Sequence, residues 1–349
     1  MTVLATNPEL KPLPASVAAP VARGLWRQAL RSPRVVVGGA MLLMMLLCCV
    51  ASLPWTGFSG AWHKGPTSFG QLFYDRQQSN FSLVPPGGGG AGLSRGQRVY
   101  LWFGSDKLGH SLLGRCLVGG VISLTIGVTA AAISVVLGVG VGLLAGYHGG
   151  WLDALLMRSV DVLFGLPYIL LVILFKIAFE RPLSAGFAKH LGQSFPSTQA
   201  ANLMVLFLGI GLVSWLTMAR VIRGQVLSLR SQPFIEACRA SGLTEWRIFT
   251  RHLLPNLVGP ITVYATLTVP AAILQESFLS FLGVGIQAPL PTWGSLASDG
   301  LSLALNPISS CWWLLLFPCT LLALTLLSLN FMGDGLRDVL DPKREAAKI

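Results

Sequence analysis

The chain has 349 residues, of which 53% are hydrophobic and 11% are charged, and its formal net charge is +11. Soluble domains carry roughly 25% charged residues, so a chain with half that density cannot present a water-facing surface over most of its area. The composition therefore predicts a membrane protein whose exterior mostly faces lipid, and the long apolar stretches described below predict that it is all-α and polytopic. Its basic residues form no dense tract that would track phosphates, so nucleic acid is not expected as a partner.

The N-terminal part reads as a tail followed by a first membrane helix. Residues 1–22 are rich in Pro, Ala and Val, which is typical of a flexible segment. In 23–31 the apolar side chains share one helical face, which favours a short helix lying on the membrane surface. We therefore assign 1–33 to a cytoplasmic tail with an interfacial helix, and 34–53 to the first transmembrane helix.

Five further apolar stretches form a predicted core over 115–332, each near the length that a bilayer requires. They cover residues 116–146, 158–179, 200–219, 256–282 and 310–332. The stretch 158–179 has a charge-free centre of only 14 residues, so it needs Asp161 near one interface and Lys176 reaching the other. A further stretch, 296–305, is too short to span and is expected to be re-entrant or interfacial.

Six spans place both termini on one side, and the distribution of positive charge indicates which side. With the termini inside, sixteen of the 25 Lys and Arg residues are cytoplasmic. Residues 333–349 then form a cytoplasmic tail, and 54–114 form an extracytoplasmic loop. Pro85, Pro86 and the glycines 87–90 predict a flexible stretch in that loop, without a packed core of its own.

The cytoplasmic loop 220–256 carries six arginines yet has helix signals. Pro233 suits the first position of a helix, and Gly242 interrupts it. Thr244 is placed to cap a second helix that ends before Pro255. One face of the first helix is partly apolar, with Phe234, Ile235, Cys238 and the stem of Arg239. An exposed surface of this kind predicts docking of a partner.

The spacing of residues in this loop resembles the EAA loop of ABC importer permeases. The matching positions are Glu236, Ala237, Cys238, Gly242, Leu254 and Pro255. The resemblance implies the type I importer permease fold, with the loop acting as a coupling helix in a groove of an ATPase subunit. Cys238 stands where the family usually has alanine, which exchanges one small side chain for another.

Further stretches resemble the second-permease (C-type) branch of the dipeptide, oligopeptide and nickel permeases. The segment Gly104–Gly109 is similar to the family's GTDxLGRD motif, and the match breaks at His110 and Ser111, where the family usually has Arg and Asp. The resemblance continues through residues 276–283 and 333–342. It covers about 104–342 and leaves 54–103 unmatched.

This resemblance implies a permease subunit of an ATP-driven importer for dipeptides or oligopeptides in a bacterial inner membrane. Nickel or another small solute is the alternative within the family. The implied partners are a second permease subunit in a heterodimer, two ABC ATPase subunits and an extracytoplasmic solute-binding protein. The sequence has no P-loop, hydrolase motif or CxxC pair, so we expect no catalytic residue, cofactor or metal, and assign ATP hydrolysis to the partners.

Two sets of residues inside the predicted spans are candidates for a role in transport. Gly138, Gly142 and Gly146 form overlapping GxxxG units, which allow helices to approach closely. The interface they make either moves during transport or packs statically. Glu276, near the outer end of its span, is a candidate pore or gate residue, with a structural hydrogen bond as the alternative.

Two other classes of membrane protein remain as competing hypotheses. An ion-coupled secondary transporter often has broken helices with ionisable residues at mid-membrane. Here Glu276 and Lys176 lie near the ends of their predicted spans instead. An intramembrane enzyme would need a nucleophile or metal cluster, and the sequence offers none.

Overall fold

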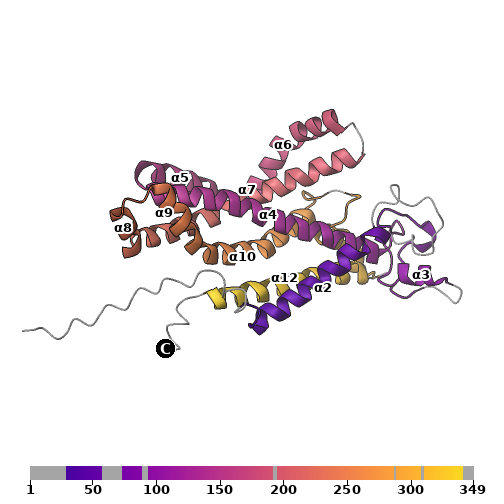
Figure 1. The fold of residues 1–349 in the computed structure, drawn as a ribbon. Coiled ribbons are helices and arrows are strands. Elements are labelled where there is room, and N and C mark those ends of the chain that lie inside the picture. The colour runs from indigo at the N-terminus through magenta and orange to yellow at the C-terminus, as the bar shows by residue number, and fades with distance from the viewer. Residues whose placement is uncertain are drawn as a thin grey trace, which may run out of the picture.

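The computed structural model describes residues 29–56, 73–88, 93–191, 195–286, 288–307 and 310–340 (Figure 1). These residues are mostly helical and contain no β-strand, apart from one isolated bridge between Ser105 and Ser111. The all-α prediction is therefore confirmed. The expected N-terminal tail, residues 23–28 of the expected surface helix at 23–31, and residues 341–349 lie outside the described residues.

Five helices in the described part of the chain are long and apolar enough to cross a membrane. They are α2 (Pro33–Thr56), α4 (Leu112–His148), α7 (Phe195–Arg230), α10 (Leu254–Phe281) and α12 (Trp313–Leu340). The shorter helices are α3 (Arg95–Tyr100), α8 (Pro233–Ala240), α9 (Glu245–Ile248) and α11 (Trp293–Ala304), with a 3₁₀ turn at Ser79–Phe81 and a π-helical turn at Phe249–Leu253.

The predicted span over 158–179 is not one continuous helix, because the chain breaks there into two helices. Helix α5 (Gly150–Phe164) and helix α6 (Tyr168–Leu191) are bent by 96° relative to each other. Pro167 lies in the break, and proline disfavours the helical conformation of the residue before it. The pair makes a sixth span only if its two halves form one broken crossing.

Helix α4 lies at the centre of the bundle, where it packs against α7, α10 and α2. The first and last long helices, α2 and α12, lie side by side (Figure 1). Their contact is close because Gly38 faces the backbone of α12, where an added Cβ would lie 2.6 Å from the Ser328 carbonyl oxygen. Helix α6 packs on α7, and α6 projects from the bundle together with the first part of α7 (Figure 1).

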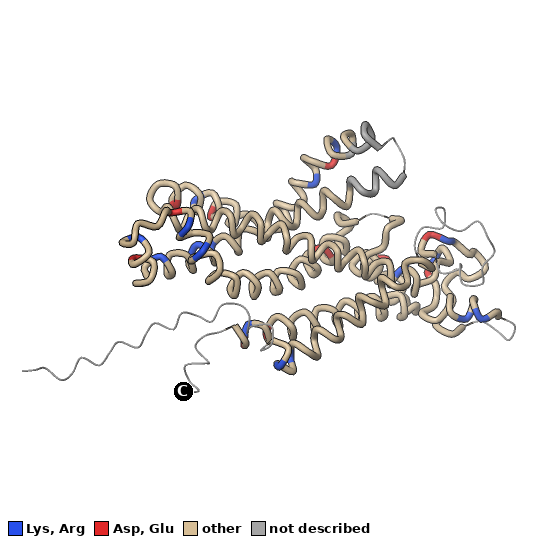
Figure 2. The backbone as a smooth tube through the Cα atoms, in the orientation of Figure 1, with Lys and Arg blue, Asp and Glu red and all other residues tan. Residues whose placement is uncertain are grey.

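Charged residues gather at the two ends of the molecule and on the projecting α6, and the long helices between the two ends carry few (Figure 2). One end holds α8, α9 and the last residues of α12, whereas the other holds α3 and the residues around it (Figure 1). We name residues 233–253 the α8–α9 tip, and residues 73–88 with 93–111 the α3 cap. This division into polar ends and an apolar middle is the one that a bilayer imposes.

The α3 cap contradicts the expectation that this region lacks a packed core. Tyr74, Tyr100 and Leu101 are buried there. The hydroxyl of Tyr100 donates to the carbonyl of Gly109, and the indole Nε1 of Trp313 in α12 donates to the carbonyl of Ser105 over 3.3 Å. Large aromatic side chains thus form a buried core in the α3 cap, although its proline and glycine content had predicted a flexible segment.

Three helix ends also differ from the expectation. Helix α7 continues to Arg230, and α12 continues to Leu340 instead of ending at 332. The second helix of the arginine-rich loop does not end before Pro255, because α9 passes through the π-helical turn directly into α10. Pro255 lies in the first turn of α10, directly after the π-helical turn, and has no N–H to donate to that turn.

Candidate functional site

The α8–α9 tip is an ordered unit built around three buried aliphatic side chains. Ile235 of α8, Ile248 of α9 and Leu253 of the π-helical turn are fully buried against one another. Tyr147 at the end of α4 and Leu229 at the end of α7 pack against this cluster. The tip is therefore fixed to the ends of two long helices.

A glycine ends α8 and turns the chain back. Gly242 has a φ of +72°, a conformation that glycine adopts without steric cost. Its N–H donates to the Arg239 carbonyl over 2.9 Å, and the Leu243 N–H donates to the Cys238 carbonyl over 3.2 Å. This pair of bonds is the Schellman motif, with Leu243 and Cys238 in apolar contact with the same cluster.

The residues of the predicted coupling loop are divided between the surface and the core of the tip. Glu236, Ala237, Gly242 and Pro255 are exposed, whereas Cys238 and Leu254 are half-buried. Glu236 forms no ion pair with the residues that the structure describes. The tip thus presents a carboxylate and small side chains outward while burying its aliphatic face.

The sequence analysis did not single out Trp246, which is 73% exposed at this tip. Its ring stacks on Phe249 with centroids 5.7 Å apart and an interplanar angle of 14°. Arg239, Arg247 and Arg251 are exposed on the same tip. A tryptophan inside a polar, arginine-rich stretch could have identified this surface from the sequence. Trp and Arg are enriched among the residues that contribute most to binding between proteins.

The other three arginines of the loop are bound to neighbouring helices. Arg223 of α7 contacts Asp153 of α5 through two hydrogen bonds of 2.5 and 2.6 Å. Arg220 contacts Asp161 of α5 over 2.8 Å. Arg230 donates to the Tyr147 carbonyl at the end of α4 over 2.8 Å. These bonds fix the part of α7 that continues past the predicted end of its span. Those of Arg220 and Arg223 also hold α5 beside α7.

The three glycines of the GxxxG pattern all face α7. An added Cβ would lie 2.5 Å from the Met218 Cβ at Gly138 and 2.6 Å from the Ala219 carbonyl oxygen at Gly142. At Gly146 it would lie 2.8 Å from the Val226 Cβ. The α4–α7 interface is therefore packed at backbone distance along three turns, and its movement during transport remains a prediction.

Glu276 is fully buried between α10, α4 and the start of α11. The Ser280 hydroxyl donates to its Oε1 over 2.6 Å, and the Ser123 hydroxyl of α4 lies 3.5 Å from its Oε2. The N–H of Trp293, the first residue of α11, donates to the same Ser123 hydroxyl over 3.4 Å. In this conformation the carboxylate faces protein hydroxyls, and its role as a gate remains a prediction.

Lys176, which was expected to reach a membrane interface, contacts the turn that follows α10, and its depth in the bilayer stays a prediction. Its Nζ donates to two backbone carbonyls in the turn after α10, those of Val284 at 2.6 Å and Gly285 at 3.2 Å. A cation in a membrane helix is costly to leave without polar partners. The turn supplies these partners, so Lys176 joins α6 to the connection between α10 and α11.

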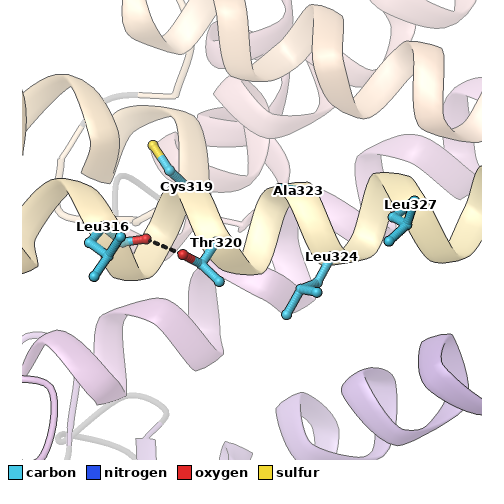
Figure 3. Close-up of a pocket in the computed structure, with 6 residues that line it drawn as sticks. All are labelled: Leu316, Cys319, Thr320, Ala323, Leu324 and Leu327. Atoms are coloured by element: carbon cyan, nitrogen blue, oxygen red, sulfur yellow. Dashed lines mark hydrogen bonds between the residues drawn. The ribbon is translucent and has the colours of Figure 1, made fainter.

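Helix α12 carries a shallow apolar groove of about 470 Å³ along one face (Figure 3). It is lined by Leu316, Cys319, Thr320, Ala323, Leu324 and Leu327. The Thr320 hydroxyl donates back to the Leu316 carbonyl over 2.7 Å, and the free thiol of Cys319 is the one titratable group in this lining. Within the described residues, no cluster of His, Cys, Asp or Glu is arranged to hold a metal ion.

Comparison with known proteins gives matches over most of the chain. Residues 138–346 match the family described as "Binding-protein-dependent transport system inner membrane component". The oligopeptide transport system permease protein OppC of Haemophilus influenzae is 42% identical over 245 residues, which are 70% of this chain and 71% of that protein. The dipeptide transport system permease protein DppC of Bacillus subtilis is 43% identical over 242 residues, 69% of this chain and 68% of its own length.

Similar identity extends to a third relative, OppC of Escherichia coli K12, which is 46% identical over 243 residues covering 69% of this chain and 72% of that protein. Among solved structures, a chain of the inward-facing MetNI methionine ABC transporter is 18% identical with a TM-score of 0.48, and the match covers 66% of this chain and 98% of that chain. The family match and the three relatives together show that this chain belongs to the inner membrane components of binding-protein-dependent transport systems.

Proposed function

We propose that this chain is a permease subunit of an ATP-driven importer for dipeptides or oligopeptides, and that its α8–α9 tip docks on an ATPase subunit. The named relatives are oligopeptide and dipeptide permeases, which supports the substrate class. The observation that carries the docking role is the exposure of Glu236 and Ala237 on a short helix whose opposite side is fixed by buried Ile235.

The connection from this tip into the bundle supports a mechanical role. Residues Glu245–Phe281 form one apolar helical stretch of 37 residues, which includes α9, the π-helical turn and α10. A displacement of the tip would therefore move the far end of α10, where Glu276 contacts α4 and lies beside the start of α11. ATP-driven closure of two ATPase subunits would supply the free-energy difference between the two states of the permease.

The proposed arrangement places the α8–α9 tip and both chain termini in the cytoplasm and the α3 cap outside the cell. Arg220, Arg223 and Arg230, together with the three exposed arginines of the tip, support this orientation by the positive-inside rule. The α3 cap then faces the solute-binding protein. A second permease subunit and two ATPase subunits complete the proposed assembly.

The test is ATP-dependent peptide uptake by the assembled transporter in proteoliposomes. Glu236→Ala keeps helix propensity in α8, so the chain should remain inserted while uptake and peptide-stimulated ATP hydrolysis become uncoupled. Asp334→Ala is the matched control, because Asp334 is an exposed carboxylate on α12 without an ion pair in the described chain. Wild-type uptake by both Glu236→Ala and Gly242→Ala would refute the docking role.

A further inference from the structure

Lys176 lies on the inward face of α6 and not on its lipid-facing side. Val172, one turn before it, is buried, and Ile169 and Ile173 pack against the same core cluster. Leu174 and Ile177, on the other side of the helix, are 60% and 69% exposed. The cation therefore points toward the bundle, the direction in which ionisable residues of membrane helices usually serve a function.

The two acceptors of Lys176 belong to a turn whose backbone is held in place. Gly283 in this turn has a φ of +79°, and a Cβ added at Gly285 would lie 2.0 Å from the Ser280 hydroxyl. Ile286, just beyond, is buried in the same cluster as Val172. The carbonyls of Val284 and Gly285 thus meet the ammonium at a defined position between α6 and α10.

The charge of Lys176 is solvated by these carbonyls but not neutralised. Within the described residues, Lys176 forms no ion pair with a carboxylate. An ammonium has three donors, of which the two carbonyls use two. A carboxylate would be a stronger partner than a carbonyl, because it adds the attraction between two opposite charges to the hydrogen bond.

The position of Lys176 on a broken helix adds a second, independent indication. It lies on the second half of the α5–α6 pair, which bends by 96° around Pro167. Interrupted helices line the substrate sites of many secondary transporters, and the α5–α6 pair shares this feature although the chain belongs to another class of transporter. A bundle-facing cation without a carboxylate partner in the described residues, on the half-helix that follows this break, is suited to bind an anionic group of a passing substrate.

We propose that Lys176 binds the C-terminal carboxylate of the peptide substrate during its passage, taking it up in exchange for a backbone carbonyl of the 284–285 turn. This inference rests on the proposed function, because it takes the substrate to be a peptide. It assigns to the permease itself a contact with the one charged group that every unmodified peptide carries at its C-terminus.

The direct test is coupling of a radiolabelled tripeptide to the assembled transporter in nanodiscs with a water-soluble carbodiimide, followed by peptide mapping. The reagent joins a carboxylate to an amine in contact with it. We expect label on Lys176, removed by excess unlabelled tripeptide but not by excess tripeptide amide. Lys107, exposed on the α3 cap, reports non-selective coupling, and label on Lys176 no greater than on Lys107 would overturn the proposal.

Uptake by two variants separates binding of a carboxylate from a purely structural bond. Lys176→Gln can still donate to both carbonyls but has no charge, whereas Lys176→Arg keeps the charge. We expect uptake to fall at least about tenfold in Lys176→Gln and to be largely retained in Lys176→Arg, because a charged partner is worth more than about 1.4 kcal/mol. Equal uptake by Lys176→Gln and wild type would mean that the bond only holds the turn.

The two proposals fail in different ways. If the wild-type assembly takes up no peptide on ATP addition, the proposed function is wrong. If it takes up peptide normally but Lys176 is neither labelled nor sensitive to loss of charge, the proposed function stands and the inference about Lys176 is wrong. Binding of a lipid phosphate by Lys176 would give this second result, because a lipid phosphate cannot link the tripeptide to the lysine.

Discussion

Arg223 of α7 and Asp153 of α5 are joined by two parallel hydrogen bonds, Nε to Oδ1 at 2.5 Å and Nη2 to Oδ2 at 2.6 Å. Their side chains are 35% and 15% exposed. The pair ties the first half of the broken α5–α6 element to the helix that leads into the α8–α9 tip. It therefore links the candidate substrate region to the candidate coupling region.

Breaking this pair is expected to destabilise the purified permease. Arg223→Gln should lower its free energy of unfolding in detergent by about 1–2 kcal/mol, a value reduced for the partial exposure of the arginine. Arg158→Gln on α5 is the control, because Arg158 is exposed and has no ion pair among the described residues. A loss in Arg158→Gln as large as that in Arg223→Gln would contradict a specific role for the pair.

The α4–α7 interface predicts opposite outcomes for two nearby glycines. Gly142→Ala should destabilise the chain by about 1–3 kcal/mol, because the new Cβ would overlap α7. Gly140→Ala, on the same helix, has no atom within 4 Å of the added Cβ and should be neutral or stabilising by up to about 1 kcal/mol. The thermal unfolding midpoints of both variants measure this difference. Equal midpoints for the two variants would exclude close packing of Gly142 against α7.

The effect of substitutions at Gly242 should depend on whether the new residue adopts positive φ, and not on the size of its side chain. No atom lies within 4 Å of a Cβ added there, although its φ is +72°. Gly242→Asn should therefore retain more transport than Gly242→Ala, because asparagine adopts the left-handed region more readily than alanine. Uptake rates that rank alanine above asparagine would indicate that this position acts through a contact instead.

Glu276 should tolerate loss of its charge better than loss of its acceptor. Glu276→Gln keeps an oxygen that accepts from the Ser280 hydroxyl, so its stability should change little. Glu276→Ala leaves buried hydroxyls of Ser280 and Ser123 without this partner and should cost about 1–3 kcal/mol. If Glu276→Gln abolishes uptake while remaining folded, the carboxylate itself has a gating role beyond this structural one.

Acid should weaken the α3 cap through Asp106. This carboxylate accepts hydrogen bonds of 2.7 Å each from His110 Nδ1 and Arg115 Nη1. Burial by itself would raise the pKa of Asp106, but the His110 hydrogen bond and the Arg115 charge outweigh it and hold this pKa below its usual value. The stabilisation is therefore present above about pH 4, the unfolded value, and is lost as pH falls through the lower folded pKa.

Thermal unfolding of the purified chain between neutral pH and about pH 3 measures this effect, since that range spans the usual aspartate pKa. The unfolding temperature of the wild type should fall more steeply with acid than that of Asp106→Asn. Asp334→Asn, at an exposed carboxylate, should follow the wild-type curve. Parallel curves for wild type and Asp106→Asn would show that this cluster does not contribute to acid sensitivity.

Some features followed from local patterns because short-range physics determines them. Apolar length predicted long helices at each of the stretches now occupied by α2, α4, α7, α10 and α12. Pro233 predicted the start of α8. Gly242 predicted the turn after it, because a helix end needs a residue that adopts positive φ. These predictions depend only on neighbours in the chain.

Other features depended on contacts between distant residues. The bend between α5 and α6 was missed, although Pro167 signalled it, because an apolar run reads the same for a straight and a broken helix. The packing of the α3 cap depends on Tyr100 meeting Gly109 and on Trp313 reaching Ser105. The bond of Lys176 to the 284–285 turn joins residues more than one hundred positions apart.

The amino-acid sequence by itself determined the all-α class, the membrane setting and the resemblance that placed the chain in its family, because composition, hydropathy and motif spacing are properties of the chain alone. Tertiary structure decided which loop arginines pair with α5 and which remain exposed, and where the charge of Lys176 is directed. Those outcomes depend on which helices become neighbours, and the packing of side chains across helices, not local propensity, selects the neighbours.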